Sequence, residues 1–208
     1  MKAQYVEELE TLTDGQVLEM FEGLESNAIG CVNWKEDFPY APQAGFKVAF
    51  SKKAIAIRFE VEEEHVKAVT LQDHGPVWED SCVEFFVAAG DGKHYFNFEM
   101  NCIGVMLAAK RTSRHDPSYL SPEQMGMIRR FTSLPKAVTD SKGESQKWWA
   151  VEIIPFEVLG LQSAPDVLHA NFYKCGDKCD NVHFLSWAPI PLPSPDFHCP
   201  QFFEEVKL

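Results

Sequence analysis

Two apolar segments of this chain each carry a glutamate, and a tryptophan lies just ahead of the first. Glu84 lies within a run of valine and phenylalanine, and Glu99 lies between Asn97 and Asn101 in a second run. Side chains alternate between the two faces of a strand, so a glutamate inside such a run is predicted to point to the polar face of a sheet. If the two segments are neighbours, their acidic and amide groups share one face, with Trp78 at its rim. A polar surface bordered by an aromatic side chain suits a sugar.

The elements that would position these residues are predicted to be strands. Gly90-Asp91-Gly92 separates the two glutamate-bearing segments and is typical of a hairpin turn, so we expect these segments to pair as antiparallel strands. Segments 46–50 and 54–61 also alternate with period two, around a short polar turn. Further strands are predicted over 103–109, 148–155 and 169–174, with a short helical turn over 156–160.

Strands dominate this pattern and helices are scarce, which predicts an all-β chain. The 208 residues, 45% of them hydrophobic, fit one large β domain over residues 1–208. The economical architecture is a two-sheet, mainly antiparallel β-sandwich of jelly-roll or immunoglobulin-like type, with few short helices. Segment 111–127 is a long polar connection; connections of this length are often functional, but they also accept insertions freely.

Charge and hydropathy exclude some classes of partner. The formal net charge of −12 argues against nucleic acid, because phosphate binding needs clustered lysine and arginine. No apolar run is long enough to cross a membrane, so no membrane partner is expected. Residues 1–8 have no apolar core of signal-peptide type, which predicts a cytoplasmic protein as the sequence stands, and a secreted one if the N-terminus was trimmed. The oligomeric state does not follow from the sequence.

Several short motifs resemble those of family-nine carbohydrate-binding modules. They span roughly residues 25–208 and lie at 78–86, 96–104, 149–156, 171–173, 185–189 and 195–203. The resemblance implies a β-sandwich in which two aromatics clamp a terminal sugar ring, while acidic and amide side chains hydrogen-bond its hydroxyls. It also implies an oligosaccharide ligand of xylan or glucan type, attachment to polysaccharide-degrading enzymes, and the structural calcium that such modules often carry.

The resemblance assigns roles to individual residues. Trp78 corresponds to the first clamp aromatic and Glu84 to a hydroxyl acceptor. Phe197 falls where the family places its second clamp, normally a tryptophan, and its smaller face offers less stacking contact. Glu99 falls where the family tends to carry a basic residue, a departure that bears on ligand preference.

Each candidate residue also has a simpler structural interpretation. Asn171 and Tyr173 share one parity on their strand, so they either complete a polar binding floor or form an ordinary exposed edge. Trp78 either stacks on a ligand or caps the core, and Phe197 either clamps a ligand or packs the proline-rich tail. Glutamates such as Glu152 are equally typical of the solvated face of an antiparallel sheet.

Two further functional classes stay open. A glycoside hydrolase would use Glu84 with Glu99 or Glu152 as paired carboxylates, about 5 to 9 Å apart across a cleft. A sandwich without a ligand would serve as a structural or protein-interaction module. The chain has no Gly-x-Ser-x-Gly elbow, no phosphate-binding glycine loop and no His-Glu-x-x-His motif. The leading prediction is therefore non-catalytic carbohydrate binding.

The cysteines offer alternatives of their own. Four potential zinc ligands fall in one region of the sequence: His169, Cys175, Cys179 and His183. The two cysteines of this set could instead form a reducible disulfide. Cys82 and Cys102 lie in or beside apolar strand patterns and are predicted to be buried free thiols. No metal ligand is assigned from these patterns.

Overall fold

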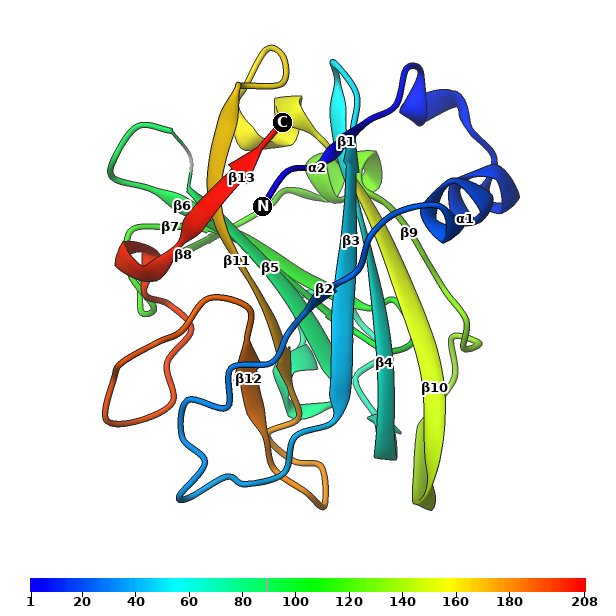
Figure 1. Cartoon of the computed structure of the whole chain (residues 1–208), viewed down its shortest axis with the longest axis vertical. Coiled ribbons are helices and arrows are strands. Elements are labelled where there is room, and N and C mark those ends of the chain that lie inside the picture. The colour runs from blue at the N-terminus through cyan, green and yellow to red at the C-terminus, as the bar shows by residue number, and fades with distance from the viewer. Residues whose placement is uncertain (89) are drawn as a thin grey trace.

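The computed structural model describes residues 1–88 and 90–208 and contains two facing β-sheets (Figure 1). The first sheet contains, in spatial order, β1 (Gln4–Tyr5), β3 (Gln43–Phe50), β4 (Ala54–Ala68), β10 (Thr139–Pro155) and β9 (Arg129–Thr132), with β2 (Asn27–Ala28) paired to β3. The second contains β12 (Phe184–Ser186), β11 (Val167–Cys175), β5 (Cys82–Ala88), β6 (Tyr95–Asn101), β7 (Met106–Arg111) and β8 (Pro117–Tyr119), with β13 (Glu204–Lys207) paired to β11. The β1–β3 pair is parallel and the other pairs of named strands are antiparallel. The predicted mainly antiparallel β-sandwich is confirmed.

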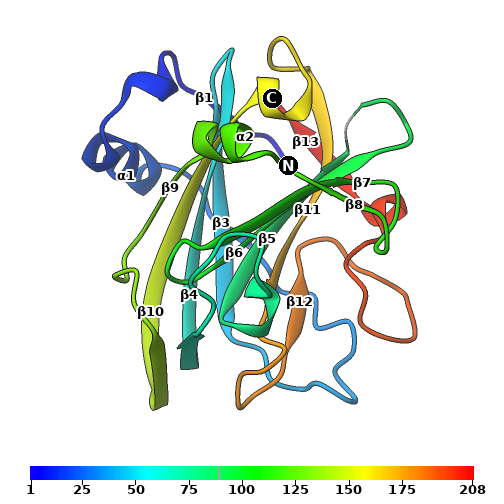
Figure 2. The same ribbon diagram turned by 180° about the vertical axis from the view of Figure 1, so that it is seen from behind.

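Helices are short and lie at the periphery of the sandwich (Figure 2). They are α1 (Asp14–Glu22), α2 (Pro122–Met127) and the 3-10 turns η1 (Leu9–Thr11), η2 (Val77–Glu79), η3 (Phe156–Leu159) and η4 (Pro200–Phe202). Val17 and Phe21 of α1 pack with Ala56 and Val151 on the outer face of the first sheet. Among the described residues, no helix combines the length and the apolar character that crossing a bilayer would take.

Strands β5 and β6 pair as the predicted antiparallel hairpin. Glu84 lies directly opposite Glu99, so the two carboxyl groups project from the same face of the second sheet. The connecting turn contains Gly90 and Gly92 with φ of 77° and 68°, a left-handed conformation that glycine adopts without steric cost. The alternating pattern and the turn dipeptides therefore predicted this part of the sheet correctly.

Aromatic stacking between the sheets identifies the interior face of each strand. Phe46 of the first sheet stacks on Phe172 of the second, with ring centroids 3.7 Å apart, and Phe172 in turn stacks on Phe85. Because neighbouring residues of a strand face opposite ways, Glu84 and Tyr173 point to the outer face of the second sheet. This outer face carries the site described below.

Glu152 does not lie on a solvated face, and here the sequence interpretation is wrong. It shares the parity of Trp148 and Ala150, which belong to the core between the sheets, and its exposed fraction is 1%. Neither of its carboxylate oxygens has a hydrogen-bond partner among the described residues. Burial raises the pKa of Glu152 to about 8, with Arg130 opposing the shift. The neighbouring Trp149 faces outward, over the Arg58 guanidinium.

A buried ion pair connects the two sheets. Lys174 of β11 is completely buried, and its Nζ lies 2.9 Å from Glu63 Oε2 on β4. Trp148 Nε1 donates to the other Glu63 oxygen at 2.7 Å, and Lys174 Nζ also lies 2.7 Å from His183 Nε2. Such a pair is strongly destabilised when one partner is removed, because the other charge is left buried and uncompensated.

Candidate functional site

A cleft of about 410 Å³ lies on the outer face of the second sheet. Its floor comes from β5, β6, β7 and β11, and its walls come from the η2 turn, the segment after β7 and the long segment that follows β12. It is lined by Trp78, Glu84, Glu99, Arg111, Arg114, His115, Pro117, Tyr119, Cys175, Asp177, Phe184, Pro195, Asp196, Phe197 and His198. Four of the six candidate sugar-binding residues thus meet in one cavity: Trp78, Glu84, Glu99 and Phe197.

The two floor glutamates are almost fully buried despite lining the cleft. Their exposed fractions are 3% for Glu84 and 4% for Glu99. Burial, and then the neighbouring Glu99, raise the pKa of Glu84 well above its usual range. Burial also raises the pKa of Glu99, against the opposing effects of Arg111 and of a hydrogen bond from Asn97. These shifts favour the protonated form of Glu84, in which the carboxyl group can both donate to and accept from a ligand hydroxyl.

Arg111 brings a positive charge to this acidic floor. Its Nε donates to Asn97 Oδ1 at 2.7 Å, and Asn97 Nδ2 in turn donates to Glu99 Oε1 at 2.8 Å. A second guanidinium nitrogen of Arg111 donates to the Arg114 carbonyl at 2.6 Å. This chain of hydrogen bonds fixes the orientation of Glu99. Sequence reasoning missed Arg111, although it ends a strand and begins the long polar connection 111–127.

Aromatic side chains form the walls of the cleft. Trp78 is half-buried, and Tyr119 is 51% exposed. Phe197 is 8% exposed and stacks on Tyr173 with ring centroids 4.2 Å and planes 11° apart. Tyr173 therefore covers one face of Phe197, and only a small part of the Phe197 side chain borders the cleft. Tyr119 was missed because nothing in its local sequence distinguishes it from other loop tyrosines.

Asn171 and Tyr173 lie on the predicted sheet face but do not line the cleft. Asn171 is completely buried: its Oδ1 accepts from the backbone nitrogens of Phe172 and Ala188, and its Nδ2 donates to the Ala188 carbonyl. Tyr173 is also completely buried and donates to the Phe197 carbonyl at 3.2 Å. Both side chains hold the segment after β12 against the sheet. They support the cleft wall instead of presenting polar atoms to the cavity.

Two further titratable groups line the cleft. His198 Nδ1 lies 2.9 Å from the Tyr95 hydroxyl, and burial together with Arg111 and Arg114 lowers the pKa of His198 to about 3. Burial raises the pKa of Asp177 to about 6, with Arg114 opposing the shift. His198 is therefore a neutral hydrogen-bonding group at pH 7. Both residues come from segments whose approach to the sheet depends on the tertiary fold.

The proposed cysteine–histidine set does not come together. Cys175 and Cys179 are both free thiols, so the loop disulfide is absent from the described residues. His169 is exposed and lies six positions from Cys175 on the same strand, about 20 Å away at the usual rise of a strand. Cys175 instead points to Glu84, while the predicted burial of Cys82 and Cys102 as free thiols is confirmed.

Comparison with known families identifies the fold of this cleft-bearing sandwich. The model of the family described as carbohydrate-binding family 9 matches residues 14–208. This chain belongs to carbohydrate-binding family 9. Among curated proteins, no match is found.

Solved structures of related proteins agree with this family 9 assignment. A putative carbohydrate-binding protein from Bacteroides uniformis is 35% identical, with a TM-score of 0.93, over 100% of this chain and 97% of the other. A family 9 module from Caldicellulosiruptor kristjanssonii, in complex with glucose, is 12% identical, with a TM-score of 0.63, over 100% of this chain and 94% of the other. Its complex with cellotriose matches with a TM-score of 0.62 at 12% identity, over 100% and 93% of the two chains. At that identity, the likeness to the Caldicellulosiruptor module concerns the fold alone.

Proposed function

We propose that the cleft of this family 9 protein binds the terminal sugar of a xylan- or glucan-derived oligosaccharide without cleaving it. The observation that carries this proposal is the meeting of Trp78 and Phe197 with Glu84 and Glu99 in one cavity. The aromatic faces suit the C–H groups of a pyranose ring, and the polar floor suits its hydroxyls. Complexes of the Caldicellulosiruptor module with glucose and cellotriose support this ligand class.

In this proposal, the two glutamates on the cleft floor discriminate between one sugar and another. Stacking on an aromatic ring is tolerant of sugar identity, whereas a buried polar group left without its partner costs about 1 to 3 kcal/mol. Glu84 and Glu99 are buried and adjacent, so a hydroxyl placed between them satisfies both. Affinity is expected to be modest, because one ring buries little area and ordered water must be displaced.

Hydrolysis is the competing function of the same carboxyl groups. Paired carboxylates of a glycosidase flank the scissile bond from two sides of a cleft. Here Glu84 and Glu99 are directly opposed on adjacent strands, so both lie on the floor, and Glu152 lies between the two sheets. This arrangement favours binding over bond cleavage.

Isothermal titration calorimetry with glucose, cellotriose and xylotriose tests the proposal. We expect the parent protein to bind at least one of them and Trp78→Ala to lose that binding. Trp149→Ala is the matched control, since Trp149 is a half-buried tryptophan on the outer face of the other sheet. Lack of binding by the parent, equal loss in both variants, or release of shorter sugars during incubation would each contradict the proposal.

A further inference from the structure

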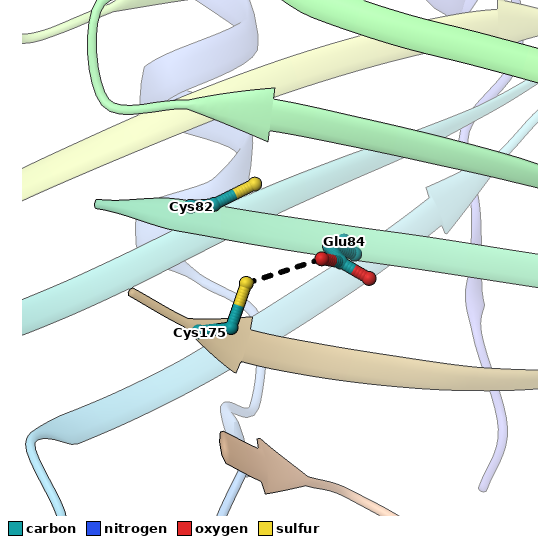
Figure 3. Close-up of side chains that lie close together, drawn as sticks. All are labelled: Cys82, Glu84 and Cys175. Atoms are coloured by element: carbon teal, nitrogen blue, oxygen red, sulfur yellow. Dashed lines mark hydrogen bonds between the residues drawn. The ribbon is translucent and has the colours of Figure 1, made fainter. Parts of the chain in front are cut away.

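Two cysteines and a glutamate lie close together on strands β5 and β11 (Figure 3), and two of the three, Glu84 and Cys175, line the cleft. Cys82 and Glu84 are two positions apart on β5, so their side chains share the outer face of the sheet. Cys175 lies directly opposite Cys82 on the neighbouring strand β11. The rigid sheet therefore positions three side chains that can ligate a metal, without help from a loop.

The distances between these side chains fit one metal ion. A ligand atom from each of Cys82, Glu84 and Cys175 lies within 4.8 Å of the other two, and Cys175 Sγ donates to Glu84 Oε1 at 3.2 Å. Around a tetrahedral zinc ion, with Zn–S of about 2.3 Å and Zn–O of about 2.1 Å, neighbouring ligand atoms are about 3.5 to 3.8 Å apart. Small side-chain rotations would bring the present arrangement to that geometry.

The two arginines that line the cleft make their bonds elsewhere and not to this cluster. Arg111 donates to Asn97 and to the Arg114 carbonyl, and the Arg114 guanidinium lies 3.6 Å from Asp196. Among the described residues, Glu84 accepts a hydrogen bond from Cys175 alone, and Glu99 adds a second carboxyl group beside it. Lys174 adjoins Cys175 in sequence, but its ammonium group points to the interior, where it pairs with Glu63. A bound dication would displace the protons of the two thiols and of Glu84, and would balance the charge of the ligands once they are deprotonated.

We propose that Cys82, Cys175 and Glu84 bind a thiolate-preferring dication of the zinc class at the floor of the cleft. Two sulfur ligands favour zinc over calcium or magnesium, which take oxygen ligands. Glu84 and Cys175 both line the cleft, so the fourth coordination position faces the cavity. A water molecule or a ligand hydroxyl would fill that position. The inference rests on the cluster itself and holds whether or not a sugar binds.

Cobalt titration of the reduced, chelator-treated protein tests this site, because cobalt replaces zinc and reports thiolate ligation by a near-ultraviolet charge-transfer band. We expect one cobalt ion per chain and loss of the band on adding zinc. Cys82→Ser and Cys175→Ser should each reduce the band to half or less, because one thiolate is lost. Glu84→Gln should weaken binding at least about tenfold, since loss of even an outer-shell partner costs that much. Cys31→Ser is the matched control, because Cys31 is a less buried thiol that bonds to the Trp187 carbonyl.

A measurement on the unsubstituted protein guards against variants that fail to fold. Crystals soaked in zinc chloride should show an anomalous scattering peak among Cys82, Glu84 and Cys175. The site is refuted if the parent, with its thiols shown to be reduced, gives no charge-transfer band. It is also refuted if the band persists undiminished in Cys175→Ser, or if zinc scatters only elsewhere. Sugar titrations on the same samples separate this result from the proposed function, since Trp78→Ala should retain the cobalt band.

Discussion

Replacing Glu152 by glutamine is predicted to stabilise the protein increasingly as the pH rises. The side chain is 1% exposed, and neither of its carboxylate oxygens has a hydrogen-bond partner among the described residues. Arg130 lies opposite it on β9, but the Arg130 guanidinium is bonded to both oxygens of Asp73 at 2.9 Å. A charged carboxylate at position 152 would therefore be buried without compensation.

The sign of the effect follows from proton binding by the two states. The pKa of Glu152 is about 8 in the folded protein, against 4.5 as its ordinary value. Between these values the folded state keeps a proton that the unfolded state has released, so the free energy of unfolding falls as pH rises. The free energy of unfolding begins to fall near pH 4.5 and stops falling above pH 8. Glutamine has no proton to lose and removes this dependence.

The size of this destabilisation at a given pH follows from the number of pH units between the ordinary pKa of Glu152 and that pH. Each pH unit within the interval corresponds to about 1.36 kcal/mol, so the carboxyl group costs about 3 kcal/mol at pH 7. Glu152→Gln should recover up to that amount at pH 7 and almost nothing at pH 4.5. Structural relaxation around the ionised group would lower the figure without changing its sign.

Urea unfolding between pH 4.5 and 8.5 measures the effect as a difference between variant and parent, so other titrating groups cancel. Glu157→Gln is the matched control, because Glu157 is an exposed glutamate close by in the sequence. Its difference from the parent should stay near zero at every pH. A Glu152→Gln difference that does not grow with pH would refute the reasoning, and would mean that the carboxylate is ionised and paired in solution.

Three other perturbations test the fold and the cleft. Lys174→Met should lower the free energy of unfolding in urea by about 3 to 5 kcal/mol, because it leaves Glu63 buried without its partner. Adding Glu63→Gln should recover part of that loss, and an unchanged unfolding midpoint in Lys174→Met would contradict the prediction. Gly176→Ala should lower the free energy of unfolding by about 1 to 3 kcal/mol, because an added Cβ would lie 2.6 Å from a histidine ring. In the control Gly126→Ala the added Cβ meets open space, so the effect should be neutral or mildly stabilising, and equal effects of the two changes would contradict the prediction. Phe197→Trp should tighten sugar binding by up to about tenfold in calorimetry through a larger stacking face, and weaker binding would count against the clamp.

The alternation of side chains predicted the hairpin and its polar face, because local rules govern both. Glu84 and Glu99 obey them, and the glycine turn sets their register. The same rule failed for Glu152, since parity shows that neighbours face opposite ways but not which face meets solvent. Which face of β10 meets solvent depends on where the second sheet and α1 pack. A short stretch of sequence does not contain that information.

The exposure of individual residues at the site could also not be predicted from the local sequence. Asn171 and Tyr173 have the parity expected of floor residues, yet the segment after β12 covers them. The same segment brings Phe197 to the cleft, a position that only the family resemblance indicated. Arg111 and Tyr119 come from β7 and β8, at the edge of the sheet opposite β12. Their place at the cavity depends on strand pairing and not on their local sequence.

The central claim is that the cleft beside Trp78 holds a sugar, and the indole resonances of the protein test it most directly. The chain has five tryptophans, so a nitrogen-15-labelled sample gives five indole N–H cross-peaks that single substitutions can assign. On titration with cellotriose, we expect the Trp78 cross-peak to shift progressively and to saturate, while that of Trp149 on the opposite sheet stays in place. A titration that leaves the Trp78 cross-peak unmoved, or that moves the Trp149 cross-peak instead, would contradict the account.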